Sequence, residues 1–284
     1  MGKVGIFAPF SLGDMTISTC LLRHKDTLWP GMKIVWFSAA NAYDILQFNP
    51  DVEEIRPHAG HHYGSDVRIP DCSGSLAPGR SKYSDVADLD LGFYTTPWGN
   101  PKLLNGRPDI PYAFFPKMVT GGNLPAWKPC IYFSKEEDDK AETFFRHLPF
   151  KKAVMLETEA RSGQSLWDQS CTDRTMEICR NTLGACNFIF ASPKSHAKNQ
   201  GRGVVDCSEF TARQCIPIYN LCDMFVGVSS GISCLTTAWT AKVIPRVEYC
   251  HNSRMSTCHL SPCSLCTSKE ALLNSIAETA KKIA

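Results

Sequence analysis

The sequence has no long hydrophobic run and almost no net charge. Its longest apolar stretches, such as residues 224–228, are far shorter than the roughly 18 residues that a membrane-spanning helix needs. The 30 Lys and Arg against 28 Asp and Glu leave a formal charge of +2, so no global field draws the chain to nucleic acid or anionic lipid. We therefore expect a protein that does not span a membrane and that binds its partners through a local site.

The N-terminus lacks the signals that direct a protein out of the cytoplasm. MGKVGIFAPF has neither the long apolar stretch nor the small-residue cleavage site of a secretion signal, and Ile6 stands where a myristoylation motif requires Ser or Thr. These absences predict a cytoplasmic protein. The 14 cysteines are a smaller share of the 284 residues than the roughly 8–10% of a disulfide scaffold, so most are expected to be buried as small hydrophobic residues.

What the sequence does contain is an alternation of strand and helix patterns in two series. The first has strands at residues 3–9, 33–37 and 52–55, with helices over 15–28 and 42–48. The second has strands at 153–156, 188–191, 224–228 and 243–247, with helices at 173–183, 212–221 and 232–241. Such alternation is typical of parallel sheets covered by helices on both faces, and it predicts two doubly wound units in tandem.

Two capping boxes mark the starts of further helices. Ser134 and Glu137 form the first, which predicts a helix that runs to about residue 147, and residues 130–133 before it predict a strand. The second spans residues 267–270 and predicts a C-terminal helix with one apolar stripe, formed by Leu272, Leu273, Ile276, Ala280 and Ile283. We place the boundary between the two units near the first box, at 135/136.

Two separate segments carry a family resemblance. The first is FSLGDMTIST at 10–19, which is followed by LLR, WPG and, at 46–52, LQFNPDV. The second is CDMFVGVSSGISCLTTAW at 222–239. In order and spacing they resemble the heptosyltransferase family of GT-B glycosyltransferases, glycosyltransferase family 9. The chain departs from the family pattern at Ser229, where the family has Asp, and at Cys234, where it has His.

The resemblance implies an α/β fold of the GT-B type, with two Rossmann-like doubly wound domains that face a cleft. Residues 1–135 would then be an acceptor-binding domain and residues 136–267 a nucleotide-sugar-binding domain. The last helix, 268–284, is expected to pack back on the N-terminal domain, as the final helix of GT-B folds does.

Asp14 is the candidate general base. Glycosyl transfer needs a group that takes the proton from the acceptor hydroxyl. A carboxylate at a strand-to-helix turn lies at the carboxyl edge of its sheet, where open α/β sheets bind ligands, and Asp14 follows such a turn. The resemblance implies that Asp14 is that base, and the alternative is an Asp that only caps its helix.

The segment Ser229–Gly231 is the candidate phosphate site. It follows a buried strand and opens a helix, so its backbone amides can receive a diphosphate without a metal ion. An ordinary turn with a Ser cap is the alternative. In the family a Lys in the loop after the first strand of the C-terminal domain meets the donor phosphates, and Arg161 is the cation in that loop here. The resemblance implies these donor-binding residues: Gly13, Glu159, Arg161, Gln164, Ser229, Ser230, Gly231 and Ile232.

Four cysteines gather within 17 residues near the C-terminus, at positions 250, 258, 263 and 266. Cys263 and Cys266 have C-x2-C spacing, and with Cys250 and Cys258 they predict a tetrahedral site for a structural zinc or iron. Some autotransporter-modifying relatives in the wider family carry a Cys-ligated iron finger near this end. A cluster of free or buried thiols is the other interpretation.

Together these features predict an inverting glycosyltransferase that moves a sugar from a nucleotide-sugar donor to an acceptor hydroxyl, with no cofactor for catalysis. The acceptor is a bacterial glycan, a protein or a modified nucleic-acid base, and the near-zero charge argues mildly against nucleic acid. The alternative is a non-catalytic binding or scaffold protein on a degenerate GT-B fold, in which the Cys-held metal loop recruits a partner.

Overall fold

The chain divides into two compact units, Met1–Tyr132 and Phe133–Ala284, close to the predicted boundary at 135/136. The computed structural model describes residues 2–8, 12–38, 40–57, 79–80, 89–92, 128–160, 166–192, 194, 197–251 and 261–284. Among these residues, no helix is both long enough and apolar enough to cross a membrane. Each unit is described below by itself.

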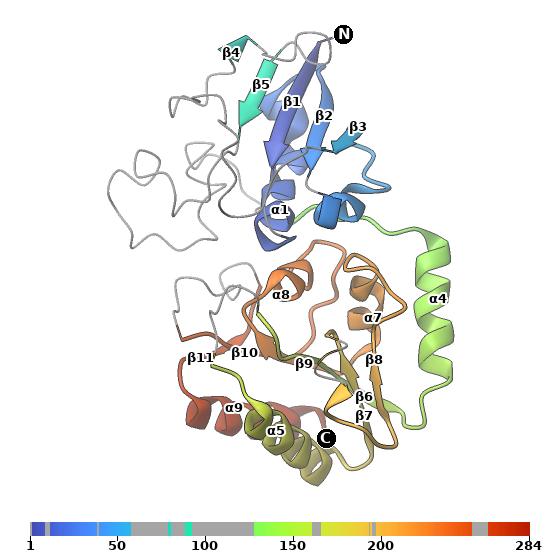
Figure 1. Cartoon of the computed structure of the whole chain (residues 1–284), viewed down its shortest axis with the longest axis vertical. Helices are drawn as coiled ribbons and strands as arrows, with labels where there is room; N and C mark the ends of the chain where they lie inside the picture. Colours follow the sequence, from blue (N-terminus) through green and yellow to red (C-terminus); the bar gives the residue numbers. More distant parts are fainter. Residues whose placement is uncertain are drawn as a thin grey trace. The chain divides into compact units, whose positions relative to one another are not determined.

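The first unit is built on one sheet with the strand order β3-β2-β1-β5-β4 (Figure 1). The parallel strands are β1 (Lys3–Ala8), β2 (Lys33–Ser38), β3 (Val52–Pro57) and β5 (Leu89–Gly92), and β4 (Gly79–Arg80) runs antiparallel to β5. The three strands predicted for this unit are thereby confirmed. The chain enters its first helix directly after β1, so that helix begins at the carboxyl end of the sheet.

The helix predicted over 15–28 is present as three shorter pieces. These are α1 (Leu12–Ser18), the 3-10 helix η1 (Thr19–His24) and α2 (Lys25–Leu28). The hydroxyl groups of Thr16 and Thr19 donate to the carbonyls of Leu12 and Thr16 at 2.7 and 2.6 Å, and such side-chain bonds compete with a regular helical ladder. The segment predicted as a helix at 42–48 is also a 3-10 helix, η2 (Ala40–Leu46).

The second unit is built on a fully parallel sheet with the order β11-β10-β9-β6-β7-β8. Its strands are β6 (Lys152–Glu157), β7 (Cys186–Phe190), β8 (Val204–Asp206), β9 (Met224–Val228), β10 (Arg246–Tyr249) and β11 (Ser264–Cys266). The chain adds strands on one side of β6 and then crosses to the other side. This is the order of a doubly wound nucleotide-binding sheet, in which the direction of strand addition reverses between β6 and β9.

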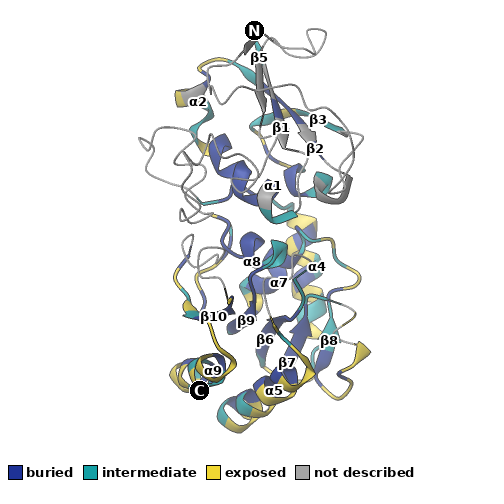
Figure 2. Cartoon of the chain, turned by 60° about the vertical axis from the view of Figure 1, so that its left-hand side comes forward, coloured by how far each residue is buried: buried dark blue, intermediate teal, exposed yellow. Residues whose placement is uncertain are grey.

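Helices cover both faces of this second sheet, and its inner strands β6, β7, β9 and β10 are buried, whereas the edge strands β8 and β11 are partly exposed (Figure 2). The helices are α4 (Lys135–Arg146), α5 (Gln169–Leu183), α7 (Cys215–Leu221), α8 (Gly231–Leu235) and α9 (Lys269–Ile283). Val154 and Leu156 of β6 join the core beneath α5 and α9. On the other face, the Tyr219 ring of α7 meets the Phe225 ring of β9 at 5.9 Å.

Helix α9 packs on the second unit's own core, which differs from the predicted packing on the N-terminal domain. Leu272, Ile276 and Ala280 are fully buried in the core shared with α5 and β10. Both ends of α9 are also tied to this unit: Lys269 forms an ion pair with Asp168 at 2.5 Å, and Lys152 donates to the last carbonyls of the helix at 2.9 Å. The apolar stripe of α9 is therefore buried in the core of the second unit.

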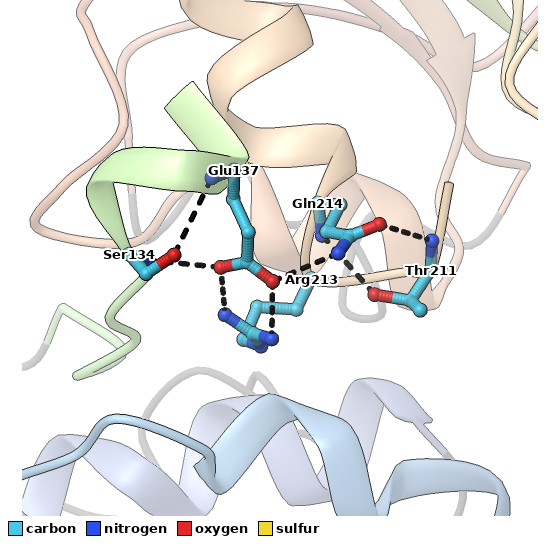
Figure 3. A network of polar contacts seen from close by, with 5 residues as sticks. All are labelled: Ser134, Glu137, Thr211, Arg213 and Gln214. Carbon is cyan, nitrogen blue, oxygen red and sulfur yellow. Dashed lines mark hydrogen bonds and ion pairs between the residues drawn. The ribbon is translucent and has the colours of Figure 1, made fainter. Parts of the chain in front are cut away.

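The capping box predicted at Ser134 and Glu137 is confirmed and belongs to a larger polar network (Figure 3). The Glu137 carboxylate accepts from the Ser134 amide at 2.9 Å and pairs with both terminal nitrogens of Arg213. Gln214 donates to the same carboxylate at 2.8 Å. Since Arg213 and Gln214 directly precede α7, the network fastens the start of α4 to the start of α7.

Three other predictions differ from the structure. Residues 130–133 form no strand, because the amide and carbonyl of Cys130 bond to the side chains of Thr19 and Asn49, each at 2.9 Å. The strand predicted at 243–247 is present as β10 and begins only at Arg246, because Pro245 has no N–H to donate to a neighbouring strand. The helix predicted over 232–241 ends at Leu235, and the three-residue strands β8 and β11 gave too short a pattern to be predicted.

Candidate functional site

The reversal of strand order between β6 and β9 brings three residues of distant segments into one row. Glu157 is in register with Gly227, and Gly227 is in register with Glu248 on β10. Residues in register on parallel strands point to the same face, so Gly227 lies between two carboxylate residues. Ligands of doubly wound sheets bind outside the carboxyl ends of the strands at this reversal, and Glu157 is the last residue of β6.

Glu157 has a buried carboxyl group. The residue is 3% exposed, and Oε1 accepts a hydrogen bond of 3.0 Å from the Glu159 amide. Removal from water raises its pKa to about 8, although the Glu159 hydrogen bond acts in the opposite direction. Glu157 is therefore protonated at neutral pH and can act as a hydrogen-bonding group, while it is a poor acceptor for a proton.

Gly227 gives Glu157 its space. A Cβ atom at Gly227 would lie 2.9 Å from the Cβ and 2.9 Å from the carbonyl oxygen of Glu157, and 2.9 Å from the Phe225 ring. Two of these neighbours are fixed by the strands, so a larger residue would have to displace the backbone of β6. The glycine thus permits β6 and β9 to approach at the site.

The turn after β9 is closed by a reciprocal pair of serines. Ser230 accepts from the Ser233 amide at 3.2 Å, and the Ser230 amide donates to Ser233 Oγ at 2.7 Å. Ser229 is buried, and its amide donates to the carbonyl of Tyr249 at 3.4 Å. Of the amides predicted to receive phosphate, that of Ser230 is therefore engaged in the capping box. Gly231 and Ile232, the first two residues of α8, supply the remaining predicted amides.

A buried ion pair on β10 contacts the backbone of α8. Arg246 and Glu248 of β10 are 3% and 0% exposed and lie 3.6 Å apart. Arg246 also donates to the carbonyl of Ser233 at 3.3 Å. Since Ser233 closes the capping box, the ion pair is linked through two residues to the turn that ends at Gly231.

The loop from β6 to α5 is anchored at both ends. At its start, Glu159 is held by Glu157 as described above, and Arg161 and Gln164 lie outside the described residues. At its end, Trp167 donates to Thr172 at 2.9 Å, and its ring lies 6.5 Å from that of Tyr249. The predicted donor residue Glu159 therefore lies beside the end of β6, at the strand reversal.

Gly13 and Asp14 belong to the first unit. They are the second and third residues of α1, the helix that follows β1 in the sequence. Asp14 is thus inside the first helical turn and does not occupy the N-cap position, where the capping alternative would place it. A carboxylate there is still favoured by the helix dipole.

No known family model matches the chain, and no curated protein matches it in sequence. Solved structures do match in fold. The Escherichia coli ADP-heptose lipopolysaccharide heptosyltransferase II is 15% identical over 99% of both chains, with a TM-score of 0.67. A glycosyl transferase of family 9 from Veillonella parvula is 10% identical over 99% of this chain and 97% of its own, with a TM-score of 0.68.

The chain has the GT-B fold of the heptosyltransferases. At these identities the likeness concerns the fold. Within it, the second unit's strand order places Glu157 and the turn after Val228 at the strand reversal of one sheet. The fold predicted from the sequence is thereby confirmed as an α/β fold of two doubly wound units.

The predicted metal site does not fit the described cysteines. Cys250 and Cys266 are buried at the ends of β10 and β11, and the Cys250 amide donates to the Cys266 carbonyl at 3.0 Å. Cys263 is disulfide-bonded, so its sulfur is not a thiolate, and burial raises the pKa of Cys266. Cys258 lies outside the described residues, among which no group of three metal-binding side chains occurs.

An iron-containing protein does share part of this GT-B fold. The dodecameric glycosyltransferase TibC from enterotoxigenic Escherichia coli is 13% identical over 87% of this chain and 57% of its own, with a TM-score of 0.54. Zinc or iron at the four cysteines of this chain stays a prediction. It requires reduction of the disulfide at Cys263, and metal analysis of freshly purified, reduced protein tests it.

Sequence reasoning missed the buried charges of the site. Arg246 and Glu248 interrupt an otherwise apolar strand, which is the one signal that could have drawn attention to them. The strand pattern of residues 224–228 does not distinguish Gly227 from its neighbours. Its role depends on β6, whose partner strand cannot be read from a local pattern.

Proposed function

We propose that the protein is an inverting glycosyltransferase that transfers a sugar from a nucleotide-sugar donor to an acceptor hydroxyl. The observation that carries this proposal is the doubly wound second unit, which brings the loop after β6 and the turn after β9 together at its strand reversal. The two solved structures compared above over nearly their whole length are glycosyltransferases, and the name of one of them specifies ADP-heptose. An ADP-sugar is therefore the first donor to test.

In this proposal the donor diphosphate binds at the strand reversal of the second unit. The amides of Gly231 and Ile232 donate to it, and Arg161 supplies a cation that can form two parallel hydrogen bonds to phosphate. Gly231 has no side chain to obstruct the approach. Gly231→Val should therefore abolish nucleotide binding, which calorimetry with ADP measures.

Asp14 acts in the proposed reaction as the general base that takes the proton from the acceptor hydroxyl. A positioned base contributes about 10² to 10⁴ in rate. Asp14→Asn keeps the side-chain shape, so the protein should stay folded and bind nucleotide while transfer falls at least about a hundredfold. Asp26→Asn is the matched control, because Asp26 is also an acidic residue in the first turn of a helix of this unit.

More than about a tenth of wild-type turnover in folded Asp14→Asn protein would remove Asp14 from the mechanism. Glu159 or Glu157 would then become the next candidate, and the burial of Glu157, which favours its protonated form, puts Glu159 first. Loss of activity in the Asp26→Asn control would instead show that the unit is sensitive to any change of charge at a helix start.

The deciding experiment for the function is a panel of ADP-, GDP- and UDP-sugars, tested for hydrolysis and for transfer. A glycosyltransferase should bind one nucleotide and release it from the sugar, slowly to water and faster to the right acceptor. The acceptor classes to supply are bacterial glycans, protein side chains and hydroxylated nucleic-acid bases. A protein that neither binds nor turns over any donor would instead be the scaffold on a degenerate fold.

A further inference from the structure

The carboxyl group of Glu157 is placed where it costs stability. A carboxyl in a buried position is less favourable than an apolar side chain of similar size, even when it is neutral. The position lies at the strand reversal, where no packing argument requires a polar residue. A buried carboxyl that lowers stability at this position indicates a role in ligand binding or catalysis and not in core packing.

Two observations define the surroundings of Glu157. Its Oε1 accepts the Glu159 amide at 3.0 Å, two residues further along the chain. Its Cβ and its carbonyl oxygen lie so close to Gly227 that a Cβ atom at Gly227 would be 2.9 Å from each of them. Glu157 is thus packed against β9, and its carboxyl binds the backbone at the start of the loop that follows β6.

We propose that Glu157 is a positioning residue for the donor: its buried carboxyl fixes the start of the loop after β6 by accepting the amide of Glu159, a predicted donor-binding residue. The proposal rests on the proposed function for the identity of what that loop binds. The anchoring itself is a property of the loop and does not depend on the ligand.

The rival role for Glu157 is that of a general base, and one substitution separates the two. Glu157→Gln keeps an oxygen that can accept the Glu159 amide but cannot take up a proton. A positioning residue should tolerate this change, and a base should not. Burial of the carboxyl, which keeps it protonated at neutral pH, favours positioning.

The test compares Glu157→Gln and Glu157→Ala in the full chain by two measurements. The first is hydrogen exchange of the Glu159 amide, which should become at least about tenfold faster in the Ala variant and stay near wild type in the Gln variant. The second is calorimetric binding of ADP, GDP and UDP. The nucleotide that binds wild type should bind the Ala variant about tenfold more weakly and the Gln variant within about threefold.

Ile189→Ala is the matched control for loss of stability. Ile189 is fully buried on β7, in register with Met155 of β6, and no hydrogen bond of its side chain is possible. It should lower stability while nucleotide affinity and Glu159 exchange stay unchanged. Gly227→Ala gives a second route to the same loop, because its Cβ must displace Glu157, and it should weaken nucleotide binding as Glu157→Ala does.

Each outcome decides a different point. Unchanged Glu159 exchange in Glu157→Ala overturns the anchoring, whether or not any nucleotide binds. Faster exchange with unchanged nucleotide affinity overturns the role in donor binding. Loss of transfer in a Glu157→Gln protein that binds nucleotide normally identifies a base. If wild type binds no nucleotide, the proposed function fails and the donor role fails with it, while the exchange measurement still judges the anchoring.

Discussion

A carboxyl group buried at the end of β6 couples the stability of the second unit to pH. Glu157 has a pKa of about 8 in the folded chain against an ordinary value of 4.5. Between these two pH values the folded state holds a proton that the unfolded chain releases. Stability therefore falls as the pH rises through this window, and it changes no further above the folded pKa.

Glu157→Gln should remove this dependence, because an amide does not titrate. The Gln variant should gain stability relative to wild type as the pH rises from 5 to 9, by about 1 kcal/mol or more, since one pKa unit corresponds to about 1.4 kcal/mol. Urea unfolding of both proteins across this range measures the difference, in which all other titrating groups cancel. Parallel stability curves would show that Glu157 is ionised or exposed in solution.

At the scale of single residues, local sequence patterns predict the turns that carry Asp14 and Ser230. They do not predict that Glu157, Gly227 and Glu248 lie side by side on neighbouring strands. The positions of Asp14 and Ser230 follow from a glycine turn between a strand and a helix, which is a pattern of a few neighbouring residues. The burial of Glu157 could not be predicted this way, because its neighbour Gly227 lies about 70 residues away in the sequence. In the sequence Glu157 simply begins a polar stretch.

At the scale of elements, a buried ion pair between Glu137 and Arg213 joins the start of α4 to the start of α7. Burial alone would raise the pKa of Glu137, but the hydrogen bonds from Arg213, Gln214 and Ser134 outweigh it and lower the pKa. The carboxylate thus contributes stability that is present above its ordinary pKa and is lost as the pH falls through the lowered folded value.

Removing one partner of this ion pair should be costly, because the other is left buried. Arg213 is 2% exposed, so Glu137→Gln should lower the free energy of unfolding by about 3 kcal/mol. A double-mutant cycle with Arg213→Met measures the coupling, and Glu142→Gln, an exposed residue of the same helix, is the control. Equal effects of Glu137→Gln and Glu142→Gln would contradict the network.

Helix α9 offers a second test at this scale. Leu272 is fully buried against the second sheet, whereas Leu273 beside it is only partly buried. Leu272→Ala should lower the free energy of unfolding by about 2 to 5 kcal/mol, and Leu273→Ala by clearly less. Urea unfolding monitored on the second unit measures both. A helix packed elsewhere would show no such contrast between the two positions.

Elements whose signals are local were the ones predicted correctly. The capping box at Ser134 identified the start of α4, because both of its residues lie within four positions. Its extension to Arg213 was not predicted, since that residue is 76 positions away. The expected packing of α9 on the N-terminal domain differs from the structure, because that expectation came from the family resemblance, and an apolar stripe specifies that a partner exists but not which one.

At the scale of the whole molecule, the division into two units makes the second a candidate for independent folding. It contains a complete parallel sheet, helices on both faces and α9 as part of its core. Residues 133–284 should therefore fold alone and unfold in one cooperative transition, as measured by circular dichroism in urea. A fragment that is disordered until the first unit is added would show that the two units share a core.

The placement of β6 at the centre of the second sheet has a consequence during synthesis. As this strand leaves the ribosome, β7 follows it closely, but β9, its other neighbour, is translated about 70 residues later. At a translation rate of about 5 to 20 residues per second, the β9 side of β6 remains unpaired for several seconds. The nascent chain must keep this apolar edge from pairing with other chains, so its yield in a cell should depend on chaperones and on the speed of translation through residues 157–224.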